Sequence, residues 1–319
     1  MEGIKLIEAD FIENNTDFNA LVSALKKHFS RKEIIVPMRH HHDFPNPQAN
    51  VDSTLLLMPA WNPGREAGVK IITTSPENGK YGLPSVQGTY VYMDSVNGKI
   101  KAILEAKALT TKRTAAASAL ASSYLSKEDS SSLLMIGTGA LATDLILAHA
   151  SIRPLKDVFV WGRNLAKAEM ICNQLEDHEF EISAVKTIEE IIRKVDIVSC
   201  ATLSKTPLVF GKYLNPGQHI DLVGSYKPDM READDEAIKR SRIYIDTFPA
   251  AIKESGDIAI PLEKGLIKED DIQADLFDLC SSSNPGRQNP EEITLFKSVG
   301  HALEDLVAAT YYYEKYDHV

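Results

Sequence analysis

A glycine-rich stretch, Ile136-Gly137-Thr138-Gly139-Ala140-Leu141-Ala142, has the residue types and spacing to bind a pyrophosphate. It matches G-x-G-x-x-A, a permissive form of the dinucleotide fingerprint, and follows an apolar run that predicts a strand. The two glycines would allow a tight turn and close backbone approach to the phosphates, which the N-terminus of the following helix would then face. A glycine turn in an unrelated α/β fold is the alternative. The predicted cofactor-binding residues here are Gly137, Thr138, Gly139, Ala140, Leu141 and Ala142.

The next apolar run ends in Val160-Trp161-Gly162-Arg163-Asn164, which bears on the choice of dinucleotide. An acid at this place would bond the ribose 2′-hydroxyl of NAD and repel the 2′-phosphate of NADP. Arg163 instead offers a planar, permanently charged fork that suits a phosphate, and Asn164 can add an amide donor. The pattern favours NADPH. NADH is the alternative, because Arg163 could merely stack on the adenine.

The composition sets the class of protein. With 319 residues the chain is long enough for two domains. Its net charge of −10 argues against nucleic acid and anionic membrane surfaces as partners, because both attract positive fields. We expect no secretory signal and no transmembrane helix. The three widely spaced cysteines favour reduced thiols in the cytoplasm.

Between residues 131 and 247 the pattern alternates between short apolar strands and helices. The helical segments include NLAKAEMICNQLE and TIEEIIRKV. The predicted strands are SSLLMIG, DVFVWGR, EISAVKT, DIVSCAT, HIDLVGS and RIYIDT. This order predicts an α/β fold with a Rossmann-type, doubly wound parallel sheet. The nicotinamide would lie at the carboxyl ends of DIVSCAT and HIDLVGS. Further predicted cofactor residues are therefore Ala201, Thr202, Val223, Gly224 and Ser225.

Residues before about 110 predict a second, α+β domain. An amphipathic helix at Asp17–Ser30 precedes strand-like segments, and Asn97-Gly98 predicts a hairpin whose turn residues both tolerate positive φ. An Ala-rich helix at Thr111–Ser126 would bridge the two domains. A last helix near Ser298–Tyr313 could return to pack on the first domain.

Several segments together resemble the ornithine cyclodeaminase/mu-crystallin family, in particular its ketimine-reductase branch. They are PMRHHHDF, LLLMPAWNPG, AGVKIIT, LPSVQGTY, LTTKRTAAASALAS, IGTGALA, GSYKPDMRE and FKSVGHALEDL. The resemblance covers nearly the whole chain and implies a homodimer. It implies a substrate-binding and dimerisation domain at 1–112 with 303–319, and a dinucleotide-binding domain at 113–302.

The resemblance also implies the substrate site. Arg39 and Arg113 resemble the pair that grips a substrate carboxylate, Lys70 resembles the lysine beside them, and Glu254 matches a position that lines the ligand pocket. Guanidinium forks suit a carboxylate. Lys70 lies in an apolar run, so a buried ammonium there needs an anionic partner or a lowered pKa; a snorkelling lysine at a strand edge is the alternative. Arg113 near a helix start opposes the dipole, which favours a bound carboxylate.

Two positions depart from the ornithine-deaminating members. Leu56 stands where they carry an acid before the LMP motif, and Tyr226 stands where they carry a catalytic Asp. These replacements disfavour ornithine as the substrate. Proton delivery to an imine requires a nearby acid or water. Asp229 and Tyr226 are the predicted proton donors beside Lys70.

The triplet His40-His41-His42 invites a metal interpretation. Adjacent strand residues point to opposite faces, so the three imidazoles cannot readily share one ion, and no Cys or carboxylate completes a ligand set. We expect no metal, and one of these side chains to face the substrate pocket.

The resulting hypothesis is a reductase that converts a cyclic 2-imino acid, Δ1-pyrroline-2-carboxylate or its six-membered homologue, to L-proline or L-pipecolate. Ornithine cyclodeaminase or alanine dehydrogenase activity is one alternative. A non-catalytic, NADPH-dependent ligand-binding protein of the mu-crystallin type is another.

Overall fold

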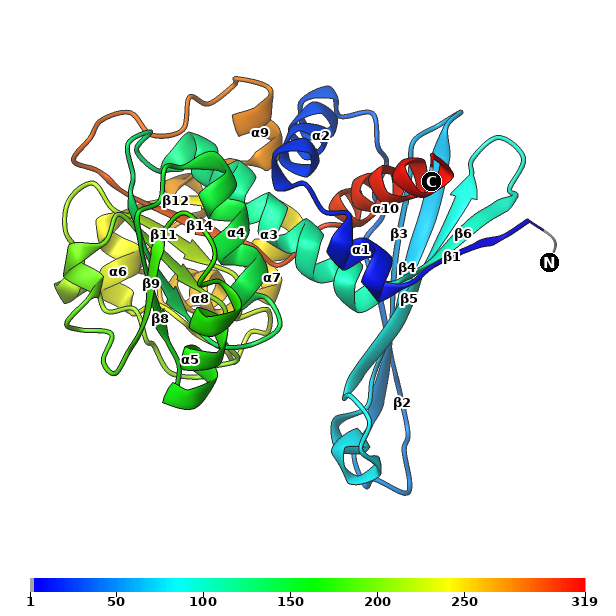
Figure 1. The fold of residues 1–319 in the computed structure, drawn as a ribbon, viewed down its shortest axis with the longest axis horizontal. Coiled ribbons are helices and arrows are strands. Elements are labelled where there is room, and N and C mark those ends of the chain that lie inside the picture. The colour runs from blue at the N-terminus through cyan, green and yellow to red at the C-terminus, as the bar shows by residue number, and fades with distance from the viewer. Residues whose placement is uncertain (1–2, 319) are drawn as a thin grey trace. The chain divides into compact units, whose positions relative to one another are not determined.

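The computed structural model describes residues 3–318, which form two compact units (Figure 1). One unit runs to Arg113 and resumes at His301, and the other is Thr114–Gly300. The expected boundaries at 112/113 and 302/303 lie one and two residues from these positions. Among the described residues, every helix is too short or too polar to cross a lipid bilayer.

The first unit contains a six-stranded sheet in the order β1-β6-β5-β4-β3-β2. Strand β1 pairs with β6 in parallel, and all other neighbours are antiparallel. The strands are β1 (Lys5–Ile7), β2 (His40–Phe44), β3 (Ser53–Trp61), β4 (Glu66–Thr74), β5 (Val86–Asp94) and β6 (Ile100–Glu105). A 3-10 helix, η1 (Pro76–Tyr81), joins β4 to β5. The α+β character expected for this part of the chain is confirmed.

The β5–β6 hairpin forms at Asn97-Gly98 but with a longer loop than the motif suggested. Gly98 has φ of 74°, whereas Asn97 is not among the residues with positive φ. Asp94 accepts hydrogen bonds on its side chain from the N–H groups of Val96 and Asn97. The predicted hairpin is confirmed, but of the two turn residues Gly98 alone uses the positive φ that the motif allows, because the Asp94 carboxylate organises the turn.

Three helices accompany this sheet: α1 (Ala9–Asn14), α2 (Phe18–Arg31) and α10 (Ala302–Asp317). Asp17 caps α2 by accepting a hydrogen bond from the N–H of Ala20. Helix α10, drawn in red in Figure 1, packs on α2 and on β3, β4 and β5. The last helix therefore does return to the first unit, as the sequence allowed.

Helix α3 (Ala106–Leu125) carries the chain from one unit into the other, since the division falls between Arg113 and Thr114. Its start is five residues earlier than predicted. Glu105 explains the difference, because its carboxylate accepts from the N–H groups of Lys107 and Ala108 and so caps the helix there.

The second unit contains an eight-stranded, fully parallel sheet in the order β13-β12-β14-β11-β10-β7-β8-β9. The strands are β7 (Ser132–Ile136), β8 (Asp157–Trp161), β9 (Glu181–Val185), β10 (Ile197–Cys200), β11 (His219–Leu222), β12 (Ser241–Ile245), β13 (Ile272–Asp275) and β14 (Ile293–Lys297). The order reverses between β7 and β10, which confirms the Rossmann-type topology and marks the edge where ligands bind.

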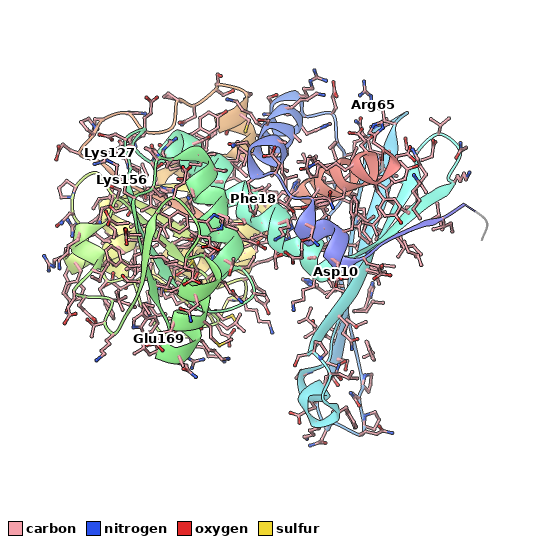
Figure 2. All side chains as sticks on the ribbon, in the orientation of Figure 1. Asp10, Phe18, Arg65, Lys127, Lys156 and Glu169 are labelled. Carbon is pink, nitrogen blue, oxygen red and sulfur yellow. The ribbon has the colours of Figure 1, made fainter. Side chains whose placement is uncertain are left out.

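Helices cover this sheet, and buried aliphatic side chains form the core between them. They are α4 (Ala142–Ile152), α5 (Leu165–Gln174), α6 (Asp235–Arg240), α7 (Phe248–Glu254), α8 (Gly256–Glu263) and α9 (Leu276–Cys280), with 3-10 turns η2 (Ile192–Lys194), η3 (Gly211–Tyr213) and η4 (Glu269–Asp271). Charged side chains such as Lys156 and Glu169 lie at the surface of this unit (Figure 2).

One predicted helix in the second unit is wrong. TIEEIIRKV forms tight turns that end in η2 rather than an α-helix. Its apolar residues Ile188, Ile192 and Val195 have helical spacing and are buried in the core. The helical spacing therefore correctly indicated which side chains are buried. The segment did not form an α-helix because it is short and its β-branched residues have low helix propensity.

Candidate active site

Lys70 is a lysine in the interior of the first unit. It lies on β4 opposite Tyr90 of β5, and only 3% of it is exposed. Its Nζ lies 2.8 Å from Oδ1 of Asp305 and 3.4 Å from Oγ1 of Thr110. Burial and the neighbouring Arg113 lower the pKa of Lys70 to about 8. Both features expected for a buried ammonium, an anionic partner and a lowered pKa, are present.

Arg113 reaches the same acidic residue from α3. Its Nε donates to Oδ1 of Asp305 at 2.9 Å, and its Nη1 donates to Oε2 of Glu304 at 2.6 Å. Burial alone would lower the pKa of Arg113, but the two carboxylates outweigh it and raise that pKa. The anionic partners of this cation thus include carboxylates of the protein itself, where the sequence suggested a ligand carboxylate.

Arg39 is close enough to these groups to act on their ionisation. It contributes to the lowered pKa of Lys70 and of Asp305. Arg39, Lys70 and Arg113 therefore form one electrostatic cluster with Asp305. Ammonium and guanidinium groups gathered in this way suit the carboxylate of a ligand.

His301 adds no charge at neutral pH. Burial and Arg39 lower its pKa to about 4, and its ring stacks on Phe29 with centroids 6.4 Å apart. It precedes α10 as the N-cap residue. The cations of the cluster are therefore Arg39, Lys70 and Arg113, and His301 is not one of them.

Sequence reasoning missed the two acids, Glu304 and Asp305. Both lie in the first turn of α10 and are 0% exposed. Acids in a first helical turn are common because they complement the helix dipole. That general preference accounts for an acid at these positions, so the sequence offers no reason to assign the two residues to a site. The two acids lie within the otherwise apolar segment HALEDLVAA. Acids at such positions are expected to be buried, and this feature of the sequence could have indicated them.

In the second unit, the glycine loop after β7 has the geometry that the fingerprint requires. Gly137 has φ of 123°, and its N–H donates to the carbonyl of Trp161 at 2.8 Å. A Cβ at this position would lie 2.5 Å from the carbonyl oxygen of Ala201. Only glycine fits this turn, because both its φ and the space around it exclude a side chain.

The start of α4 is open to an anion. Leu141, the N-cap residue, makes no side-chain capping bond, and a Cβ built on Gly139 meets nothing within 4 Å. Gly162 passes close to Thr138, where a Cβ would lie 2.6 Å from Cγ2. The loop thus presents exposed backbone and uncapped helix N–H groups, which fits the pyrophosphate of a dinucleotide.

Arg163 and Asn164 follow β8 and are both exposed. The Oδ1 atom of Asn164 accepts from the N–H of Ala166 at 3.0 Å and so caps α5. Asn164 therefore has a structural role as a cap, and its amide N–H₂ is the part that could reach a phosphate. Arg163 is the main candidate for the phosphate itself.

The loops after β10 and β11 are held together by one buried carboxylate that sequence reasoning missed. Oε1 of Glu232 accepts from the N–H and the hydroxyl of Thr202 at 2.6 and 2.9 Å. Oε2 accepts from the N–H groups of Gly224 and Ser225 at 2.8 and 3.3 Å. A side chain at Gly224 would collide with the backbone of Thr202. These contacts fix the loops predicted to meet the nicotinamide.

Glu232 belongs to a buried charge cluster beneath those loops. Lys297, at the end of β14, lies 3.7 Å from Glu232 and 3.4 Å from Asp257. Oδ1 of Asp257 accepts from the N–H groups of Glu232 and Ala233. All three charged side chains are 0% exposed. Glu232, Asp257 and Lys297 lie far apart along the sequence, so no local motif could predict that they form a cluster.

The predicted proton donors do not join the Lys70 cluster within the first unit. Asp229 belongs to the second unit, is exposed and forms an ion pair with Lys205 at 2.6 Å. That hydrogen bond lowers the pKa of Asp229, so its carboxyl is ionised at neutral pH. Tyr226 is 43% exposed. Glu254, half-buried, ends α7 of the second unit.

The histidine triplet lies on β2, where every residue is exposed. The rings of His40 and His42 are 6.1 Å apart. Over residues 3–318, no group of His, Cys, Asp or Glu side chains is arranged to hold a metal ion. Leu56, which stands in place of an acid, pairs with His41 on the adjacent strand.

Comparison with known proteins decides the family. The model of the ornithine cyclodeaminase/mu-crystallin family matches residues 6–318. The chain belongs to this family. Among its relatives, a Delta(1)-pyrroline-2-carboxylate reductase from Colwellia psychrerythraea is 36% identical over 318 residues, covering 98% of this chain and 99% of the relative.

Two solved structures are similar to this chain over nearly its whole length. The Delta(1)-pyrroline-2-carboxylate reductase of Thermococcus litoralis, in complex with NADH and L-proline, has a TM-score of 0.91 at 31% identity and covers 99% of this chain and 98% of that chain. An archaeal alanine dehydrogenase dimer with bound NAD has a TM-score of 0.89 at 26% identity and covers 99% and 97%. The predicted family is confirmed, and the relatives named Delta(1)-pyrroline-2-carboxylate reductase agree with the predicted reductase branch.

Proposed function

We propose that this family member reduces a cyclic 2-imino acid, Δ1-pyrroline-2-carboxylate or its six-membered homologue, with NADPH as the preferred reductant. The observation that carries the proposal is the cluster of cations around Asp305, in which Lys70 and Arg113 are buried and Arg39 is half-buried. A planar imino acid presents one carboxylate to such a cluster. The L-proline complex of the Thermococcus litoralis reductase supports this class of ligand.

The reaction balances with one hydride and one proton. The reduced dinucleotide, when bound, supplies the hydride that forms the new C–H bond at the imine carbon. The C=N π bond breaks, and the nitrogen needs one proton to become the secondary amine. We assign Arg39 and Arg113 to hold the carboxylate and Lys70 to lie beside it as a buried ammonium that supplies the proton.

Glu254, Tyr226 and Asp229 are secondary assignments within this proposal. Glu254 would line the ligand pocket. Asp229 would need to leave Lys205 before it could act on a proton, since that ion pair holds it ionised. A positioned water in place of Asp229 or Tyr226 would serve the same step.

The direct test of the activity measures oxidation of NADPH with Δ1-pyrroline-2-carboxylate. Pyruvate with ammonium and L-ornithine serve as matched alternative substrates. Turnover of the preformed cyclic imine supports the proposal. Faster turnover of pyruvate with ammonium would favour alanine dehydrogenation, which the archaeal structure makes the second candidate. Ligand binding without oxidation of NADPH would place the chain with the binding proteins.

Arg163→Ala is expected to remove the preference for NADPH. The loss of a charge-assisted contact to the 2′-phosphate, about 1.5–3 kcal/mol, should raise the Kd of NADPH roughly 10- to 100-fold. The Kd of NADH should change little. Fluorescence titration with NADPH and with NADH measures the ratio of the two Kd values. Lys156→Ala, which replaces an exposed lysine of the same unit, is the control. Equal weakening of both cofactors would mean that Arg163 does not contact the phosphate.

The proposal includes a homodimer that works in the cytoplasm. Exposed apolar side chains lie on or next to β2 and β5 and in the segment between β4 and β5, and the related alanine dehydrogenase is a dimer. Those side chains include Met38, Phe44, Tyr81, Leu83 and Val86. Light scattering should give twice the chain mass of 35.3 kDa. The three free cysteines support a reducing compartment.

A further inference from the structure

Asp305 forms ion pairs with two buried cations of the first unit. It comes from the first turn of α10, yet its carboxylate receives one cation from β4 and another from α3. Both contacts converge on the same atom, Oδ1, with Lys70 Nζ at 2.8 Å and Arg113 Nε at 2.9 Å. Asp305 therefore joins three elements at a single oxygen.

The convergence answers an electrostatic problem. Two buried cations that meet one carboxylate group of a ligand must lie close together, and in a poorly solvated site their repulsion is weakly screened. Each cation also loses its hydration, which destabilises the folded protein unless a partner of opposite charge compensates it. Oδ1 of Asp305 compensates both Lys70 and Arg113, and Glu304 compensates Arg113 further.

We propose that Asp305 is a positioning residue, which holds the Lys70 ammonium and the Arg113 guanidinium in place so that a substrate carboxylate enters between cations already set. The role of these cations toward substrate rests on the proposed function, whereas their dependence on Asp305 does not. Asp305 itself is 0% exposed and acts through Lys70 and Arg113.

The second oxygen of Asp305 supports a function beyond packing. Oδ2 is buried and accepts no hydrogen bond from any residue between 3 and 318. A carboxylate kept only for stability would gain from a donor at both oxygens, since an unsatisfied buried acceptor is destabilising. Burial alone would raise the pKa of Asp305, but Arg113 and Lys70 outweigh it and hold that pKa below its usual value.

The position of Asp305 also controls the proton on Lys70. Burial, Arg113 and Arg39 all favour the neutral amine, and Asp305 opposes them through its charge and its hydrogen bond. Tyr90 faces Lys70 from β5 with a neutral hydroxyl, because burial raises its pKa well above the usual value.

Two further groups border the cluster from α10 and its N-cap. His301 is uncharged at neutral pH, because its pKa is lowered to about 4. Glu304 bonds the guanidinium of Arg113. Asp305 is thus the acidic group in direct contact with the ammonium, and without it Lys70 should lose its proton at a lower pH.

The test measures the titration of Lys70 in the full-length chain labelled with ¹³C at the lysine Cε carbons. The loss of one resonance in Lys70→Met identifies the signal. The wild-type midpoint should be near pH 8. Asp305→Asn should lower that midpoint by about 1–3 units, the effect of removing an opposite charge in contact. Glu304→Gln, the matched control, removes a neighbouring charge that contacts Arg113 and should shift it less.

An unchanged midpoint in Asp305→Asn, or an equal shift in Glu304→Gln, would overturn the proposal. The alkaline limb of kcat/KM for the imine should move with the midpoint. A moved midpoint with an unmoved limb supports the role of Asp305 toward Lys70 and contradicts the proposed role of Lys70 in turnover. The two failures are therefore distinguishable.

Asp305→Glu keeps the test decisive if Asp305→Asn does not fold. This variant retains the charge but moves it by one methylene. The Lys70 midpoint should stay near the wild-type value, while displacement of both cations should lower kcat/KM for the imine by up to about 100-fold. An unchanged kcat/KM in folded Asp305→Glu would overturn the positioning role.

Discussion

Lys70→Met is expected to lower kcat/KM for the cyclic imine roughly 30- to several-thousandfold while leaving the Kd of NADPH nearly unchanged. Truncating one partner of a buried, hydrogen-bonded charge pair costs about 2–5 kcal/mol. Here the lost group is the ammonium at 2.8 Å from Asp305, which the proposal places beside the substrate carboxylate. The glycine loop and Arg163 belong to the other unit, so the dinucleotide keeps its own contacts.

Steady-state kinetics and a cofactor titration together measure this separation. Lys99→Met, an exposed lysine of the first unit, is the control and should behave like the wild type. Parallel loss of turnover and NADPH affinity in Lys70→Met would assign the effect to global damage and contradict a substrate-side role.

Arg113→Met is expected to have the largest effect on stability, about 3–5 kcal/mol lost from the free energy of unfolding. Glu304 would lose its bond to Nη1 and Asp305 its bond to Nε, while both carboxylates stay buried. At about 2–4 °C per kcal/mol for a unit of this size, the Tm should fall on the order of 10 °C.

The deficit in Arg113→Met should shrink as the pH falls. Without the Arg113 guanidinium, the buried carboxyl groups of Glu304 and Asp305 should take up a proton more readily, and protonation reduces the penalty. Thermal unfolding at several pH values, with the exposed Lys107→Met on the same helix as control, measures both effects. A Tm within experimental error of the wild type would show that the Arg113 ion pairs contribute little to folding.

The Rossmann-type unit could be predicted because its signals are local. Apolar runs ending in glycine mark the strands, and the positive φ of Gly137 requires the residue that the fingerprint names. TIEEIIRKV shows the limit of that reasoning, because buried residues with helical spacing formed only tight turns. Spacing reports which side chains face the core, and the length of a helix depends on further interactions.

The candidate site was predictable where single residues carry unusual chemistry. Lys70 within GVKII needed a partner or a lowered pKa, and the structure has both. The partner itself, Asp305, lies 235 positions away along the chain, so no local pattern could pair them. Glu232 was missed for the same reason, since its contacts to Thr202 and Gly224 exist only after the sheet forms.

The measurement that tests the central claim most directly is product analysis after reduction with NADPH that carries deuterium at both C4 positions of the nicotinamide. With Δ1-pyrroline-2-carboxylate as substrate, the account predicts L-proline with one deuterium at Cα, and formation of the same labelled product by Lys70→Met at a rate at least about 30-fold lower. Unlabelled or racemic proline, or oxidation of NADPH without any proline, would contradict hydride transfer to an imine carbon held by its carboxylate.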